Sequence, residues 1–174
     1  MDLKAQFGEI IDKLRRQKPV IHHITNYVTA ESCADIALAA GASPVMADEP
    51  EEVEEITCNA DALVLNFGTF SFNKMISMEK AVIMAKEAGI PVILDPVGVM
   101  SSSMRLQFAL KLLENRYISI VRGNFSSSIL GKLQAFSLTS RLSNIIYAIA
   151  VNFTVEQCGA FAKIATHNAN ISVL

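Results

Sequence analysis

Apolar positions along the chain alternate between two spacings, one typical of amphipathic helices and one of buried strands. The first predicted helix carries apolar residues three or four positions apart, namely Leu3, Phe7, Ile10, Ile11 and Leu14. Pro19-Val20-Ile21 then begins a strand, and a second helix is expected over about 28–40. Thr25 and Asn26 are candidate caps of that helix, and Gly41 is its expected stop.

The same alternation continues to about residue 121. Further short apolar runs predict strands at 44–46, 62–67, 91–94 and 118–121. Between them, helical spacing predicts a helix opened by Pro50, one that ends at Gly89, and one that contains 106–113. Strands that are apolar on both faces and separated by helices are typical of a parallel sheet covered on both sides. We therefore predict an α/β fold with a doubly wound parallel sheet and right-handed crossovers.

Composition narrows the class of protein. A chain of 174 residues, 51% of them hydrophobic, is long enough for one sizeable core, so a single domain over 1–174 is expected. The formal net charge of -2 leaves no basic surface suited to a nucleic-acid backbone. No run reaches the ~18 uncharged apolar residues that would span a bilayer, and the N-terminus lacks the apolar segment of a secretory signal. We expect a cytoplasmic protein with no nucleic-acid or membrane partner.

Several residues that can bind metals are not expected to do so. Cys33, Cys58 and Cys158 are odd in number and too far apart for a metal motif, which suits a reducing compartment, and the first two are expected as small core residues. His22 and His23 are adjacent in a strand, so their side chains should point to opposite faces. One run of carboxylates is expected to be a solvated first helical turn: Asp48, Glu49, Glu51, Glu52, Glu54 and Glu55.

The predicted topology indicates where a ligand should bind. In open parallel sheets, ligands collect at the carboxyl ends of the strands. This rule selects the loops that start at His22, Met46, Asn66, Asp95 and Arg122.

Two charged residues lie at neighbouring strand ends of this edge. Asp95 can hold Mg²⁺ while the metal bridges phosphate oxygens, or it can accept backbone N–H groups in a turn with Pro96. Arg122 can bind phosphate with its planar fork beside Gly123, or it can extend into solvent. Asn124 can bind a phosphate or ribose oxygen, or shape a turn.

Four short motifs resemble those of hydroxyethylthiazole kinases, the thiazole-salvage enzymes of thiamin biosynthesis, within the ribokinase-like superfamily. The resemblance covers about 18–126 and rests on Ile24-Thr25-Asn26-Tyr27-Val28, Gly41-Ala42-Ser43-Pro44-Val45-Met46, Leu94-Asp95-Pro96-Val97-Gly98 and Arg122-Gly123-Asn124. It implies a three-layer ribokinase-like fold and transfer of the ATP γ-phosphate to the hydroxyl of 4-methyl-5-(2-hydroxyethyl)thiazole. It also implies Mg²⁺ and a homotrimer with the thiazole pocket between subunits.

The resemblance also implies the site residues. Asp95 is implied as the metal ligand, and Arg122 and Asn124 as ATP-binding residues. The acceptor pocket would contain Asn26, Met46 and Gly68, since an amide can bond the alcohol, a thioether can pack on the ring, and glycine lets the ring approach the backbone. Each has a plainer interpretation, as a helix cap, core filling or a turn residue.

The chain departs from the family after this region. The family's Asp-Pro-Val-Gly continues with glycine and small residues, whereas this chain reads Val99-Met100-Ser101. Ser126-Ser127 replaces a Ser-Glu pair whose carboxylate would assist the metal, and 130–174 is an atypical, apolar tail of helical spacing. The family's Gly-Thr-Gly-Cys turn, whose N–H groups stabilise the transferring phosphoryl group, does not occur, so the catalytic residues stay unassigned.

Two interpretations of function therefore stand. The first is an ATP-dependent hydroxyethylthiazole kinase, a phosphotransferase to an alcohol group. The second is a shortened, non-catalytic member that binds thiazole or forms oligomers.

Overall fold

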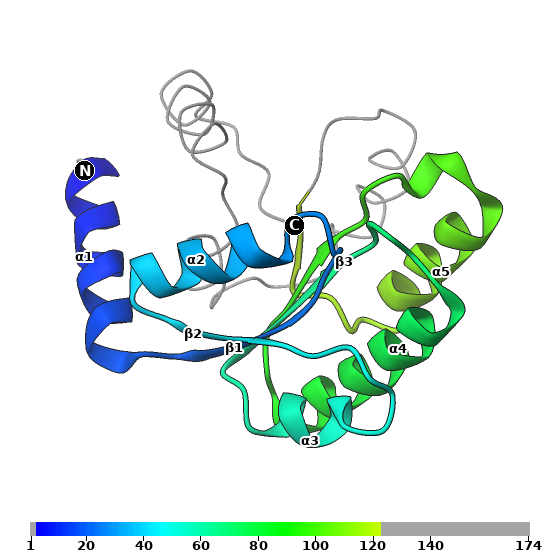
Figure 1. Ribbon diagram of the computed structural model, residues 1–174, viewed down its shortest axis with the longest axis horizontal. Coiled ribbons are helices and arrows are strands. Elements are labelled where there is room, and N and C mark those ends of the chain that lie inside the picture. Colours follow the sequence, from blue (N-terminus) through cyan, green and yellow to red (C-terminus); the bar gives the residue numbers. More distant parts are fainter. Residues whose placement is uncertain (1–2, 123–174) are drawn as a thin grey trace.

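The computed structural model describes residues 3–122, and it confirms the predicted α/β fold (Figure 1). Five parallel strands form one sheet: β1 (Val20–Ile24), β2 (Ser43–Met46), β3 (Ala62–Asn66), β4 (Val92–Asp95) and β5 (Ile120–Val121). Five helices and one 3-10 turn connect or flank them: α1 (Leu3–Gln17), α2 (Ala30–Ala40), α3 (Val53–Cys58), α4 (Phe72–Ala88), η1 (Val99–Ser101) and α5 (Ser103–Glu114).

The strand order is β2-β1-β3-β4-β5. The chain therefore forms β1 first, adds β2 as one edge of the sheet, and then adds β3, β4 and β5 in turn on the other side of β1. The register sets β1 against β3 with His23 opposite Val64, and β3 against β4 with Asn66 opposite Asp95. In Figure 1, α1 and α2 lie on one side of the sheet, while α3, α4 and α5 lie on the other. The arrangement is the doubly wound layer that the alternating pattern predicts.

Alternate residues of β1, β3 and β4 build two cores. On the side of α3, α4 and α5, the larger core contains Leu63, Leu65 and Leu94 of the sheet with Met78 and Val82 of α4. On the other side, the core contains Ile21, Val64 and Ile93 packed with the alanines of and after α2. Strands buried on both faces explain why their sequences are almost entirely apolar.

The helix ends follow the predicted glycine stops. Gly41 and Gly89 have φ angles of 101° and 71°, and each follows the last residue of its helix in the left-handed conformation that favours glycine. The Asn26 side chain accepts a hydrogen bond from the backbone N–H of Thr29, so Asn26 does support the start of α2. Thr25 makes no such bond; its carbonyl instead accepts from Lys74.

Some sequence expectations differ from the structure. The helix that Pro50 was expected to open begins at Val53, because the preceding residues form turns, and β5 is shorter than 118–121. Cys58 was predicted to be a core residue, but it is exposed at the end of α3. Within 3–122, no helix is both long and apolar enough to cross a membrane. Asn124, Cys158 and the predicted tail over 130–174 lie outside the described residues.

Candidate functional site

Three polar side chains form a row across the carboxyl edge of the sheet. Asn66 ends β3 and is the register partner of Asp95, which ends β4. Arg122 follows β5, where its backbone N–H donates to the Leu94 carbonyl at 2.8 Å. Its Nε lies 4.0 Å from Oδ2 of Asp95. The acidic and basic groups at neighbouring strand ends are therefore side by side, as the sequence predicts.

The environment of Asp95 opposes its negative charge. Burial raises the pKa of Asp95 above its ordinary 3.8, while the nearby Arg122 and a hydrogen bond from the Asn66 side chain lower the pKa and only partly offset that effect. The carboxylate is nonetheless reachable, since 17% of the side chain is exposed. Arg122 and Asn66 offset the negative charge of this buried carboxylate only in part. A cation bound at Asp95 would offset the rest.

The polar row continues into the loop between β1 and α2. Asn26 Nδ2 donates to Asn66 Oδ1 at 3.0 Å, and the same oxygen accepts from the backbone N–H of Gly68 at 2.8 Å. Asn26 Oδ1 accepts from the N–H and the hydroxyl of Thr29. The network therefore joins two predicted pocket residues to the candidate metal ligand.

Gly68 is held close to that network. A Cβ at this position would lie 2.6 Å from Cβ of Asn26 and 2.9 Å from Oδ1 of Asn66. These distances are too short for real contacts, so a larger residue would force the two asparagines apart. The glycine is required by its neighbours in the protein, whatever ligand binds beside it.

Met46, the third predicted pocket residue, is not enclosed in the core. It ends β2, the edge strand, and 37% of its surface is exposed. Because β2 pairs only with β1 in the described sheet, its outer side is not covered by another strand. The core-filling interpretation is therefore weakened, and the thioether is accessible at the carboxyl edge.

A buried lysine of α4 holds two loops of this edge together. Lys74, in the first turns of α4, is 2% exposed. Its Nζ donates to the Thr25 carbonyl at 2.5 Å, lies 3.3 Å from an Asp48 carboxylate oxygen and sits 4.1 Å from the centroid of the Tyr27 ring. The Tyr27 hydroxyl in turn donates to Asp48 at 2.9 Å. Asp48 therefore forms an ion pair with Lys74, and it precedes the first turn of α3, which contains Glu54 and Glu55 of the acidic run.

Two further α4 residues fasten the loop between β2 and α3. Ser77 Oγ donates to the Asp48 carbonyl at 2.6 Å, and Lys80 Nζ donates to the Pro50 carbonyl at 2.8 Å. Together with Lys74 they recur every three residues along one side of the helix, a spacing that aligns side chains. On the other flank, Arg105 of α5 donates to the carbonyls of Phe67 and Val97.

The two buried histidines of β1 have opposite surroundings. His22 Nδ1 lies 2.8 Å from the Thr57 hydroxyl and Nε2 lies 2.9 Å from the Ala47 carbonyl oxygen, so both ring nitrogens are satisfied. His23 is 1% exposed, and neither ring nitrogen has a hydrogen-bond partner in the part of the chain that the structure describes. Burial, with a smaller contribution from His22, lowers the pKa of His23 to about 4. Within 3–122, no group of three or more His, Cys, Asp or Glu side chains is arranged so that it could hold a metal ion.

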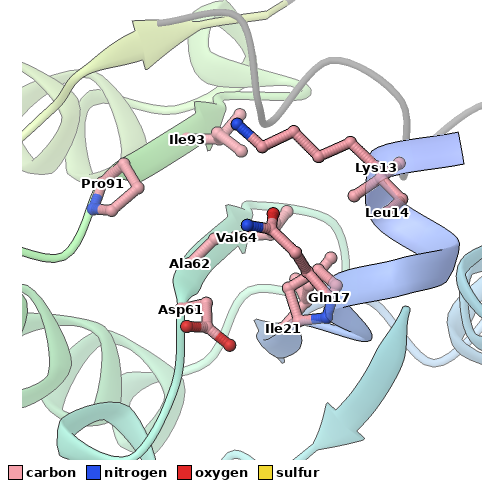
Figure 2. A pocket seen from close by; sticks show the side chains of 10 residues that line it. Lys13, Leu14, Gln17, Ile21, Asp61, Ala62, Val64, Pro91 and Ile93 are labelled. Atoms are coloured by element: carbon pink, nitrogen blue, oxygen red, sulfur yellow. The ribbon is translucent and has the colours of Figure 1, made fainter. Parts of the chain in front are cut away.

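A cavity of about 570 Å³ lies at the opposite end of the strands (Figure 2). Its wall includes Ile21, Val64 and Ile93, and polar groups come from Lys13, Gln17 and Asp61. Asp61 precedes β3, and its carboxylate accepts from the backbone N–H of Val20 at 2.8 Å. The cavity therefore lies at the amino ends of the strands, whereas ligands of such sheets bind at the carboxyl ends.

Sequence reasoning missed Asn66, Lys74 and Arg105 as site-forming residues. The strand-end rule had marked Asn66 as a loop start without giving it a role. The polar spacing of Lys74, Ser77 and Lys80 on an otherwise amphipathic helix was a readable signal that α4 contacts polar backbone. Arg105 had no distinguishing pattern, because an arginine in a first helical turn is ordinarily solvated.

Comparisons with known proteins agree on one family. The hydroxyethylthiazole kinase family model matches residues 11–141. The hydroxyethylthiazole kinase of Clostridium tetani is 54% identical over 126 residues, which are 72% of this chain and 46% of that protein. The enzyme of the same name from Alkaliphilus metalliredigens is 51% identical over 119 residues, which are 68% of this chain and 44% of that protein.

A solved structure gives the same result. The hydroxyethylthiazole kinase protein from Pyrococcus horikoshii superposes with a TM-score of 0.68 and 39% sequence identity, over 77% of this chain and 53% of that one. The chain thus spans about half the length of the relatives it matches.

Proposed function

Because this chain belongs to the hydroxyethylthiazole kinase family, we propose that it transfers the γ-phosphate of ATP to the hydroxyl of 4-methyl-5-(2-hydroxyethyl)thiazole. The observation that most supports the proposal is the joined row of Arg122, Asp95, Asn66 and Asn26 at the carboxyl edge. A ligand-free fold gains little from gathering charged and amide groups at one edge unless they bind something polar. The proposed location of function is the cytoplasm.

Asp95 is the proposed ligand of Mg²⁺. Mg²⁺ takes few protein ligands and keeps waters and phosphate oxygens, so a single accessible carboxylate is a suitable donor set. The partly uncompensated burial of Asp95 fits a bound cation. When bound, Mg²⁺ supplies positive charge that offsets the charge of the phosphates. Arg122, beside Asp95, and Asn124, outside the described residues, are proposed to hold the nucleotide.

The acceptor alcohol is proposed to lie over Asn26, Met46 and Gly68. Asn66 uses one of the two Nδ2 hydrogens of Asn26, so the second can donate to the alcohol or the ring nitrogen. The exposed thioether of Met46 suits packing against a flat heterocycle. Asn66 fixes the backbone at Gly68 through a hydrogen bond. The Gly68 backbone is therefore a rigid wall of the pocket that carries no side chain.

We further propose that copies of this chain self-associate, as a trimer, with the pocket at the subunit boundary. Apolar side chains are exposed around the acceptor loops, with Tyr27 72% and Val28 84% exposed. An exposed apolar group next to a binding site is typical of a surface covered by a partner. Light scattering at micromolar concentration should give three times the monomer mass; a single species of monomer mass would remove the proposal.

A second candidate is a thiazole-binding protein without phosphotransfer. The observation that favours it is Ser127 in place of the family's glutamate, since the carboxylate that would assist the metal is then missing. This candidate keeps the acceptor pocket and the oligomer but lacks catalysis.

One pair of measurements separates the two candidates. A coupled phosphotransfer assay with hydroxyethylthiazole and ATP-Mg²⁺ should be run beside isothermal titration with the thiazole alone. Turnover that depends on both Mg²⁺ and the thiazole supports the kinase. Thiazole binding without turnover supports the binding protein, and a chain that neither binds nor reacts contradicts both.

A further inference from the structure

Asn66 stands between the two halves of the proposed site. It is the register partner of Asp95, and partners in adjacent parallel strands project from the same face of a sheet. On its other side it contacts the loop that carries Asn26 and the loop that carries Gly68. Among the described residues of the row, only Asn66 both lies opposite the candidate metal ligand and is hydrogen-bonded to the two candidate acceptor loops.

The orientation of the Asn66 amide is fixed by its partners. The backbone N–H of Gly68 can only donate, so the atom that it contacts at 2.8 Å must be the amide oxygen. The same oxygen accepts from Asn26 at 3.0 Å, which uses both of its lone pairs. The amide nitrogen is the remaining donor of this side chain, and the nearest carboxylate across the sheet is that of its register partner Asp95, whose pKa Asn66 helps to lower.

This arrangement exceeds what a local turn requires. An asparagine that bonds the N–H two residues ahead forms an ordinary Asx turn, and that bond alone would explain the Gly68 contact. The bond to Asn26, which is 40 residues away in sequence, and the position opposite Asp95 on the next strand are not part of such a turn. Asn26 is in turn held by Thr29 at the start of α2.

We propose that Asn66 is a positioning residue that couples the nucleotide half of the site to the thiazole half. It holds the Asp95 carboxylate through its amide nitrogen and the Asn26 and Gly68 loops through its amide oxygen. This inference rests on the proposed function and predicts that Mg²⁺-nucleotide and thiazole bind cooperatively. Coupling between linked sites is typically about fivefold or more.

Two substitutions divide the role of the amide. Asn66→Asp keeps an oxygen for Gly68 and Asn26 but replaces the donor to Asp95 with a second negative charge. Asn66→Ala removes both functions. Asn59→Ala is the matched control, because Asn59 is an exposed asparagine whose amide donates only within its own helix region, to the Glu55 carbonyl at 2.9 Å.

The first measurement is titration of the full chain with 4-methyl-5-(2-hydroxyethyl)thiazole, with and without a saturating non-hydrolysable ATP analogue and Mg²⁺. The nucleotide should raise thiazole affinity about fivefold in the wild-type chain and in Asn59→Ala. Asn66→Asp should retain thiazole affinity within about threefold but lose the increase, and Asn66→Ala should weaken thiazole binding about tenfold. Coupling that survives in Asn66→Asp, or unchanged affinity in Asn66→Ala, overturns the proposal.

The second measurement needs no ligand. Hydrogen exchange of the Gly68 amide, followed by NMR, should be slow in the wild-type chain and in Asn66→Asp, and at least about tenfold faster in Asn66→Ala. Equal exchange in all variants shows that Asn66 does not hold the loop. A wild-type chain that binds neither ligand overturns the proposed function and with it the coupling, while the Gly68 exchange rate still decides whether Asn66 positions this loop.

Discussion

The two ends of the sheet both carry polar groups near an apolar surface, yet they differ in how those groups are connected. At the amino ends of the strands, Lys13, Gln17 and Asp61 surround a cavity of about 570 Å³, and Asp61 bonds only strand backbone. At the carboxyl ends, Asn66 lies opposite Asp95 in the strand register and is hydrogen-bonded to Asn26, so the three side chains form one row. The cavity is therefore at one end and the connected polar side chains are at the other.

The difference teaches that convergence of polar side chains is better evidence for a site than the volume of a cavity. Each of the loops that follow β1, β2, β3 and β4 is held by at least one side chain from a different element, as Lys74 holds the Thr25 carbonyl and Arg105 holds that of Val97. Such cross-links fix the geometry of loops that carry few buried apolar residues. A binding site needs that rigidity, because loops left free would have to be ordered by the ligand.

The largest expected effect comes from removing the buried cation of the carboxyl edge. Lys74→Met should lower the free energy of unfolding by about 3 kcal/mol, because it leaves the Thr25 carbonyl without its donor and the Asp48 carboxylate without its cation. Lys111→Met is the control, since Lys111 pairs with Glu79 on the surface and should contribute less than about 1 kcal/mol. Urea unfolding of both variants checks this; equal losses would show that the cluster at Lys74 does not stabilise the edge.

Crowding the network should have the next largest effect. Gly68→Ala places a methyl group 2.6 Å from Cβ of Asn26, so we expect a loss of about 2 kcal/mol in stability and about tenfold in thiazole affinity. Gly8→Ala, in α1, meets no atom within 4 Å and should stabilise the chain slightly. Thermal unfolding and thiazole titration measure the two effects. If Gly68→Ala binds the thiazole as tightly as the wild-type chain does, the hydrogen-bonded network does not shape the thiazole pocket.

His23 is a buried side chain whose ring nitrogens have no hydrogen-bond partner among the described residues, and its effect on the free energy of unfolding should depend on pH. Its pKa in the folded chain is about 4, below the ordinary 6.5, so between these values the unfolded chain binds a proton that the folded chain does not. The contribution of His23 to the free energy of unfolding should therefore be constant above pH 6.5. It should fall on acidification, by about 2 kcal/mol at pH 5.

His23→Leu should remove that part of the acid sensitivity. His22, whose pKa is also lowered by burial, acts in the same direction in both chains and cancels from the comparison. Unfolding free energies of both chains, measured from pH 7 to 5, provide the check. Identical pH dependence of the two would show that His23 titrates normally when folded.

The smallest effect on stability is expected at Met46. Because 37% of this residue is exposed on the edge strand, Met46→Ala should cost less than about 1 kcal/mol in unfolding free energy. If the thioether packs on the thiazole ring, affinity should nevertheless fall about fivefold. Titration of the folded variant measures this, and unchanged affinity would refute the pocket assignment.

Much of the fold could be read from the chain, because β3 and β4 are apolar runs up to their last residue and Gly41 and Gly89 end helices in the conformation that glycine permits. The position of the site was also predictable, since Asp95 and Arg122 follow neighbouring strands. The links between loops were not. Lys74 and Asp48 are 26 positions apart, and no local pattern shows that α4 brings a buried amine against that carboxylate.

The most direct test of the central claim is titration with Mg²⁺ and a non-hydrolysable ATP analogue of two matched variants, one at each end of the sheet. Asp95→Asn removes the charge at the carboxyl edge, and Asp61→Asn removes the charge beside the cavity at the amino edge. We expect Asp95→Asn to abolish Mg²⁺-dependent nucleotide binding while retaining the fold and thiazole binding, and Asp61→Asn to bind as the wild-type chain does. Loss of nucleotide binding in Asp61→Asn, with Asp95→Asn unaffected, would contradict the account.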